Sequence, residues 1–134
     1  MIVDTSAVAA ILFGEPEAAR YTKVIHDADR CLMSVANFVE LCIVVEGQLG
    51  TSAGRQCDMF FQRAGIVIEP VTVEQGHLAR QAFHDFGKGR HPASLNFGDC
   101  FAYALAKSMG EPLLFKGKDF SKTDIEPVVG PRPT

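Results

Sequence analysis

Four acidic residues have surroundings that point to metal chemistry: Asp4, Glu40, Asp99 and Asp119. Glu40 and Asp99 are each the single acid of a long apolar segment, residues 35–45 and residues 95–106. An unpaired buried carboxylate is costly or takes up a proton, so burial calls for a cation as partner. Oxygen ligands without His or Cys suit Mg²⁺ or Mn²⁺ better than Zn²⁺. Because such an ion can polarise a phosphodiester and activate a water, phosphodiester hydrolysis is the predicted chemistry.

The two acids outside these segments also have structural explanations. Asp4 follows a short apolar run and could cap a helix, but Thr5 and Ser6 can take that role and leave its carboxylate free. Asp119 could be one of many solvated loop acids. Its place soon after an apolar strand favours a role in the site, and Asp124 is the weaker candidate.

The two acids within apolar segments are harder to explain by structure alone. Glu40 could pair with a Lys or Arg, and the helix dipole favours Asp99 in a first turn by roughly 0.3–1 kcal/mol. Gly98 costs the helix up to about 1 kcal/mol relative to Ala, which suggests that something approaches the backbone beside Asp99. Asn96 caps this helix and, three residues before Asp99, can face the same way.

Short apolar runs alternate with longer segments of helical pattern. Strands are predicted at residues 1–3, 31–33, 66–68 and 113–115, with a short fifth strand at 127–129. Helices are predicted at residues 7–13, 16–27, 35 to about 49, 52–64, 73–86 and 97–109. This alternation predicts an α/β three-layer sandwich, with a parallel sheet of four or five strands flanked by helices. In such sheets the functional site lies beyond the carboxyl ends of the strands.

Basic residues flank the predicted acidic edge. A flexible loop at 87–92 and a polar loop at 116–122 carry the candidates for phosphate contacts: Lys88, Arg90, His91, Lys116, Lys118 and Lys122. For each residue a solvated side chain is an equal alternative. The formal net charge of −3 argues against a nucleic-acid binder. Part of that acidic excess is the predicted site itself, which a bound metal would neutralise.

The bulk properties predict a single cytoplasmic domain. The 134 residues fit one domain over residues 1–130, with a frayed tail at 131–134. With 47% hydrophobic and 22% charged residues, the composition excludes a disordered chain. No apolar run reaches the ~18 residues of a membrane span, and the N-terminus lacks a basic targeting region. The cysteines form neither a metal-binding nor a disulfide pattern: Cys31, Cys42, Cys57 and Cys100.

Five motifs in order carry a family resemblance: MIVDTSA at 1–7, NFVE at 37–40, GRHPA at 89–93, LNFGDCFAY at 95–103 and LFKGKDF at 114–120. Together they resemble the PIN-domain ribonucleases, and among them the VapC toxins of bacterial toxin–antitoxin pairs. The resemblance implies a PIN-like sandwich and a Mg²⁺ or Mn²⁺ site. Asp4, Glu40 and Asp99 match the family's acidic triad, and Asp119 matches its more variable fourth acid.

The resemblance also implies a function: cleavage of structured RNA, often transfer RNA, with arrest of growth. It further implies a homodimer and a cognate VapB-type antitoxin, whose C-terminal segment occupies the active-site groove. Our mechanistic hypothesis is that Asp4 and Asp99 bind the first ion, and that Glu40 and Asp119 complete the site. Ligand carboxylates need hydrogen-bond partners of their own, and the candidates are Thr5, Ser6 and Asn96.

Two other functions stay open. A binding module could keep the acids for structure or metal sensing, and it would bind metal without turnover. Haloacid-dehalogenase-like phosphatases also have an Asp after the first strand, but they need a second acid two residues later, where this chain has Ser6. An assay with a small phosphomonoester would test that alternative.

Overall fold

Four short parallel strands form the centre of the computed structural model, which describes residues 1–130. They are β1 (Ile2–Val3), β2 (Cys31–Ser34), β3 (Ile66–Glu69) and β4 (Leu113–Leu114). The strands lie in the order β3-β2-β1-β4, and every neighbouring pair is parallel. The predicted frayed tail, residues 131–134, lies outside the described residues.

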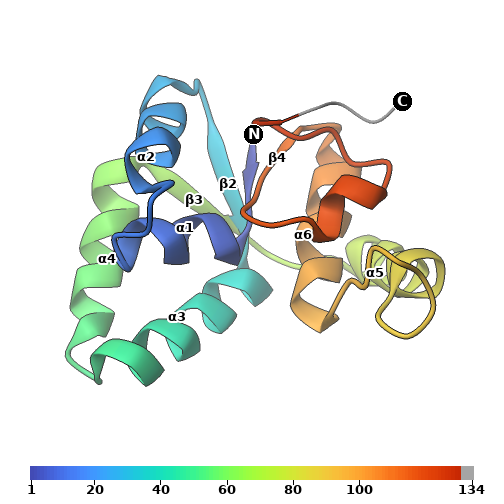
Figure 1. The fold of residues 1–134 in the computed structure, drawn as a ribbon, viewed down its shortest axis with the longest axis horizontal. Helices are drawn as coiled ribbons and strands as arrows, with labels where there is room; N and C mark the ends of the chain where they lie inside the picture. Colours follow the sequence, from blue (N-terminus) through green and yellow to red (C-terminus); the bar gives the residue numbers. More distant parts are fainter. Residues whose placement is uncertain (131–134) are drawn as a thin grey trace.

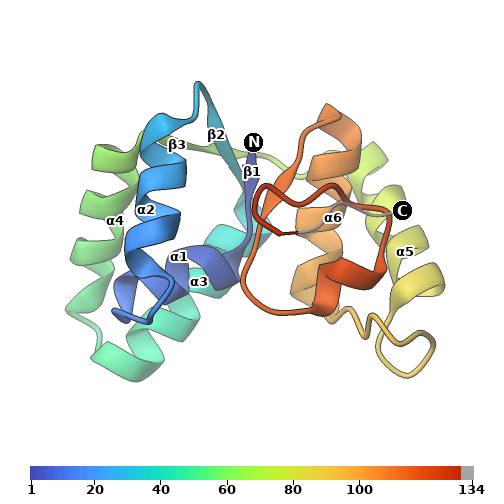
Figure 2. The same ribbon diagram turned by 45° about the horizontal axis from the view of Figure 1, so that its top comes forward.

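Helices cover both faces of this sheet. They are α1 (Thr5–Leu12), α2 (Ala18–Asp27), α3 (Val35–Leu49), α4 (Ala53–Ala64), α5 (Val73–Phe86) and α6 (Phe97–Met109). Figures 1 and 2 show α1 to α4 on one side of the sheet and α5 and α6 on the other. The predicted three-layer α/β sandwich is therefore confirmed. Among the residues described, no helix has the length and apolar character needed to cross a membrane.

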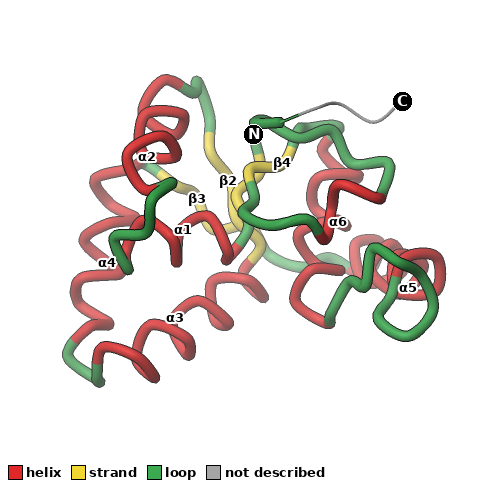
Figure 3. Tube along the Cα trace, viewed as in Figure 1, coloured by secondary structure: helices red, strands yellow, loops and turns green. Residues whose placement is uncertain are grey.

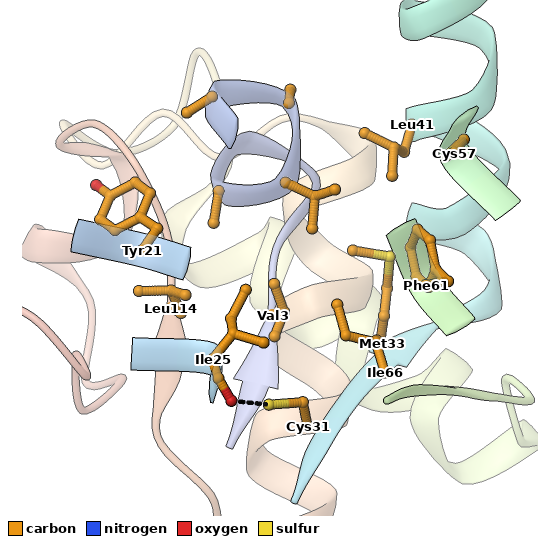
Figure 4. Close-up of a cluster of buried hydrophobic side chains, with 14 of the residues drawn as sticks. Val3, Tyr21, Ile25, Cys31, Met33, Leu41, Cys57, Phe61, Ile66 and Leu114 are labelled. Carbon is orange, nitrogen blue, oxygen red and sulfur yellow. Dashed lines mark hydrogen bonds between the residues drawn. The ribbon is translucent and has the colours of Figure 1, made fainter. Parts of the chain in front are cut away.

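Each face of the sheet has its own apolar core, because successive strand residues point to opposite faces. Val3 packs with the helices of the α1–α4 side, and Ile2 packs with those of the α5–α6 side. Figure 4 shows the first core, which includes Val3, Met33 and Leu41. Burial on both faces explains why β1, β2 and β4 are continuous apolar runs. The edge strand β3 is also apolar, although Val67 and Ile68 are exposed.

The chain after β4 differs from the prediction in two ways. Residues 127–129 do not form a fifth strand: a single parallel bridge joins Pro127 to Leu113. The bridge consists of two hydrogen bonds, from Leu113 N to Glu126 O at 2.9 Å and from Val128 N to Leu113 O at 3.0 Å. The predicted polar loop contains the 3-10 helix η1 (Asp119–Lys122), held by the buried Phe120 and visible in Figure 3.

Helix α3 is not buried all round, contrary to the sequence-based interpretation. Its buried residues are spaced by four, which places them on one face: Asn37, Leu41 and Val45. A second set with the same spacing forms an exposed apolar face, with Val35 37%, Val39 51% and Ile43 67% exposed. The apolar pattern predicted burial, but only one side of α3 has a neighbouring layer to pack against.

Candidate metal centre

The carboxyl end of β1 and the N-terminal ends of α1, α3 and α6 lie near one another (Figure 1). The first acid there is Asp4, which is the N-cap of α1. Its Oδ2 accepts hydrogen bonds from Ser6 N at 3.1 Å and from Ser6 Oγ at 2.6 Å. The prediction that Thr5 and Ser6 cap this helix and leave Asp4 free is therefore wrong. Thr5 Oγ1 instead donates to Asn37 O at 3.1 Å.

The cap uses only one of the two carboxylate oxygens of Asp4. Its Oδ1 is buried and has no hydrogen-bond partner among the described residues. Burial raises the pKa of Asp4 to about 6, although two hydrogen bonds from Ser6 favour the charged form. The charge of Glu40 contributes to this rise. A cation would supply the partner that this buried oxygen lacks.

Asp99 lies in the first turn of α6 and shares a capping box with Asn96. Asn96 Oδ1 accepts from Asp99 N at 2.9 Å, and Asp99 Oδ2 accepts from Asn96 N at 3.0 Å. The pKa of Asp99 is raised to about 7, mainly by burial, and the charges of Asp4, Asp119 and Glu40 contribute to the rise. Asp99 is thus within electrostatic reach of the other three acids singled out from the sequence.

Glu40 is half-buried, whereas its apolar segment predicted a largely buried helix. Within residues 1–130 its carboxylate forms no ion pair with a Lys or Arg. Asn37 Nδ2 lies 3.5 Å from Glu40 Oε1 and 2.9 Å from Gly98 O. The expectation that something approaches the backbone at Gly98 is confirmed, because a Cβ there would lie 2.1 Å from Glu40 Oε2.

Asp119 and Asp124 have different surroundings. Asp119 opens η1, is exposed, and exerts its charge on Asp99. Asp124 accepts a hydrogen bond from Tyr103 Oη at 2.7 Å and pairs with Lys107 Nζ at 2.5 Å. These contacts commit Asp124 to a separate cluster that supports α6.

The acids do not form a closed metal cage. Within residues 1–130, no three acidic, His or Cys side chains stand close enough together to enclose an ion. Mg²⁺ keeps several of its waters and is commonly held by one or two carboxylates plus substrate phosphates. An orphaned buried Asp4 oxygen beside a second buried carboxylate fits such a partly hydrated ion, and the oxygen-only donors fit Mg²⁺ or Mn²⁺.

Lys116 is already engaged by acidic residues. Its Nζ pairs with Glu15 and, at 3.1 Å, with Glu17, both in the connection between α1 and α2. Its backbone N donates to Ser6 Oγ at 2.9 Å, so Ser6 joins the Asp4 cap to the end of β4. A phosphate could use this ammonium only by replacing or sharing these carboxylates.

The other predicted phosphate contacts lie on exposed connections. Arg90 is exposed and lies 5.9 Å from the centre of the Phe83 ring. His91 Nδ1 accepts from Ala93 N at 3.0 Å, which orders the loop after α5. Lys118 is exposed beside Asp119. His91 is half-buried, with its ring packed against Phe86. Among the described residues, no ion pair joins Arg90, His91 or Lys118 to an acid of the candidate site.

Asn37 was missed by the sequence interpretation. It is fully buried and contacts the helix that carries Asp99 as well as Glu40. The sequence did carry a signal for this role. Asn37 is an amide inside an apolar segment and lies three residues before Glu40, and side chains three residues apart lie on the same face of a helix.

Residues 1–126 match the family model described as the PIN domain. The chain is 45% identical over 131 residues to "VapC ribonuclease Mb0640" of Mycobacterium bovis, covering 98% of this chain and 100% of that protein. It is 45% identical over 128 residues to "Ribonuclease VapC" of Mycolicibacterium smegmatis, covering 96% and 99%. The crystal structure of Mycobacterium tuberculosis VapC20, a "Sarcin-Ricin loop cleaving toxin", has the same fold, with a TM-score of 0.75, 19% identity and 98% of each chain covered. The chain therefore belongs to the PIN-domain family, among its VapC ribonucleases.

Proposed function

We propose that this protein is the toxin of a toxin–antitoxin pair, a divalent-metal-dependent endoribonuclease that hydrolyses phosphodiester bonds in structured RNA. Transfer RNA or another RNA of translation is the proposed target, and growth stops until a VapB-type antitoxin neutralises the toxin. The observation that carries the proposal is the buried, unpartnered Oδ1 of Asp4 near Asp99. The relatives support it, since they are named ribonucleases. We further propose that residues 1–130 form one nuclease domain that acts in the cytoplasm.

In this proposal Asp4 and Asp99 hold the first Mg²⁺ or Mn²⁺. When bound, the ion polarises the phosphodiester and lowers the pKa of a water. Ser6 and Asn96 each hold one oxygen of these carboxylates, which leaves the other oxygen of each available. Glu40 and Asp119 complete the site by ligation, through water, or by orienting the attacking water.

Basic side chains at the rim would hold the RNA backbone. The candidates are Arg90, His91, Lys116 and Lys118. Lys116 would exchange its pairs with Glu15 and Glu17 for a phosphate. Arg90 and Lys118 are exposed, and His91 is half-buried. Phosphate contacts position RNA without reading its sequence. In this proposal the shape of the groove therefore determines which RNA is cleaved.

Cleavage of pooled cellular RNA by the purified protein tests this function. We expect discrete fragments with Mn²⁺ or Mg²⁺ and none with chelator. Identically prepared Asp99→Asn protein controls for contaminating nuclease. Cleavage that persists with chelator would contradict the proposal. So would a protein that binds metal but does not cleave RNA from the cells in which it occurs.

A matched pair of acids tests whether Asp119 belongs to the site. We expect Asp119→Asn to lower kcat/KM for RNA cleavage about 10- to 100-fold, the usual effect of losing a partner near a metal. Asp124→Asn should leave kcat/KM unchanged and cost less than about 1 kcal/mol of stability, because its pair with Lys107 is partly exposed. If the two changes altered kcat/KM equally, Asp119 would not be part of the site.

The exposed apolar face of α3 is the proposed homodimer surface. Contiguous exposed apolar side chains commonly mark an interface, and Phe97, 78% exposed, adds to this one. We expect Ile43→Glu to halve the mass measured by light scattering. Met59→Glu, a change at a 44% exposed residue of α4, should leave the mass unchanged. A dimer that survives Ile43→Glu would place the interface elsewhere.

A further inference from the structure

One buried residue connects the three helices that carry or follow the acids Asp4, Glu40 and Asp99. Asn37 is 0% exposed, and its Nδ2 donates to Gly98 O in α6 at 2.9 Å and lies 3.5 Å from Glu40 Oε1. Its backbone carbonyl accepts from Thr5 Oγ1 in α1 at 3.1 Å. The amide must present its nitrogen here, because its oxygen would face two other oxygens.

Gly98 allows the Glu40 carboxylate to lie against the first turn of α6. A Cβ at this position would lie 2.1 Å from Oε2, 2.6 Å from Cδ and 2.7 Å from Oε1 of Glu40. Apart from the adjacent residues and the nearby backbone of α6, these are the three nearest heavy atoms, and all belong to one carboxylate. A side chain at position 98 would therefore displace Glu40, not the backbone of a neighbouring helix.

Gly98 has no role in the backbone that would explain its presence. It lies within α6, and its φ is not among the positive values of this chain. Glycine is a poor residue inside a helix, and alanine would favour α6. The glycine thus lowers local helix stability while it provides space for a carboxylate of the candidate site.

We propose that Asn37 and Gly98 are positioning residues, which together fix the Glu40 carboxylate beside Asp99 at the divalent-metal site. Gly98 provides the space, and Asn37 directs one oxygen of Glu40 while it ties α3 to α6. Neither residue touches metal or RNA. The inference rests on the proposed function, because it takes Glu40 as part of the Mg²⁺ or Mn²⁺ site.

The test is a double-mutant cycle with two measurements on each full-length variant: Mn²⁺ affinity by calorimetry, and Tm without metal. Gly98→Ala should weaken Mn²⁺ binding about 10- to 100-fold while Tm stays the same or rises. In a Glu40→Ala background, Gly98→Ala should have no further effect on affinity. The matched control is Gly76→Ala in α5, where a Cβ meets nothing within 4 Å, and it should not change Mn²⁺ affinity.

Asn37→Ala should weaken Mn²⁺ binding to a similar degree but lower Tm, because it removes a buried hydrogen-bonding side chain. Since a purely structural residue would also lower Tm, Gly98→Ala is the decisive variant. Wild-type affinity in Gly98→Ala would overturn this inference, as would an equal loss in the Glu40→Ala background. If the wild-type protein itself binds no Mn²⁺, the proposed function fails as well.

Discussion

Replacing Asp99 by asparagine is expected to reduce metal-dependent RNA cleavage more than about 100-fold without unfolding the protein. Mutating a residue that only hydrogen-bonds to a metal ligand lowers metal affinity or activity about 10- to 100-fold. Removing a ligand itself should therefore lower kcat/KM by more than this. Asparagine keeps an oxygen that can accept from Asn96 N, so the capping box that begins α6 can persist. The change removes a charge from a buried position with little loss of volume.

The measurement is kcat/KM on one RNA fragmented by the wild-type protein, together with Tm. Asp124→Asn provides the control for removing an acid near α6, since Asp124 is engaged by Tyr103 and Lys107. Wild-type kcat/KM in Asp99→Asn would mean that the acidic cluster is structural. A collapse of Tm would mean that Asp99 is needed for folding, which its uncompensated burial argues against.

Without divalent metal, the contribution of the acidic cluster to stability should fall as the pH rises from about 4 to about 7. The folded-state pKa values of Asp4 and Asp99 are about 6 and about 7, against 3.8 for an unperturbed Asp. In this window the folded protein retains protons that the unfolded chain has lost, so raising the pH favours unfolding. The loss is on the order of a few kcal/mol. Above pH 7, Mn²⁺ at 100 times its Kd should raise the free energy of unfolding by about 2.7 kcal/mol.

Unfolding in urea at several pH values, with EDTA or with Mn²⁺, measures this effect. Other groups titrate in the opposite sense: Asp27 and Glu111 have lowered pKa values, so their stabilisation is lost in acid. The relevant quantity is therefore the difference in free energy of unfolding between the wild-type protein and Asp99→Asn. We expect this difference to grow between pH 4 and 7 with EDTA, in favour of the variant. Parallel profiles would show that Asp99 is not held as a costly buried acid.

Much of the fold could be predicted because its signals are local. All four strands appear as short apolar runs, including the partly exposed β3, and Ser34, Thr72 and Asn96 are good capping residue types that begin α3, α5 and α6. The failures concern features without a local signal. The apolar pattern of α3 is the same whether a neighbouring layer covers Ile43 or leaves it exposed. Pro127 pairs at a single position, which a run of three residues could not reveal.

The acids of the candidate site could be proposed from the sequence, because an unpaired carboxylate in an apolar segment is costly to bury. The strands before Asp4 and Asp119 also indicated one edge of the sheet. The hydrogen-bond partners of these acids could not be predicted from the sequence. Asp4, Thr5 and Ser6 are all good capping residues, so sequence alone does not decide which of them caps α1. In the fold Asp4 is the cap, and Thr5 donates to the carbonyl of Asn37, more than thirty residues along the chain. The pairing of Lys116 with Glu15 likewise joins segments far apart in sequence. Such contacts depend on the assembled fold, not on local pattern.

The central claim is that these carboxylates hold a divalent ion, and anomalous diffraction from crystals soaked in Mn²⁺ tests it most directly. Our account predicts an anomalous peak within ligand distance of Asp4 Oδ1 and the Asp99 carboxylate, with Glu40 bound directly or through water. The same soak of Asp99→Asn crystals should show no peak at this place. A peak only elsewhere on the protein, or none in crystals of wild-type protein saturated with Mn²⁺, would contradict the account.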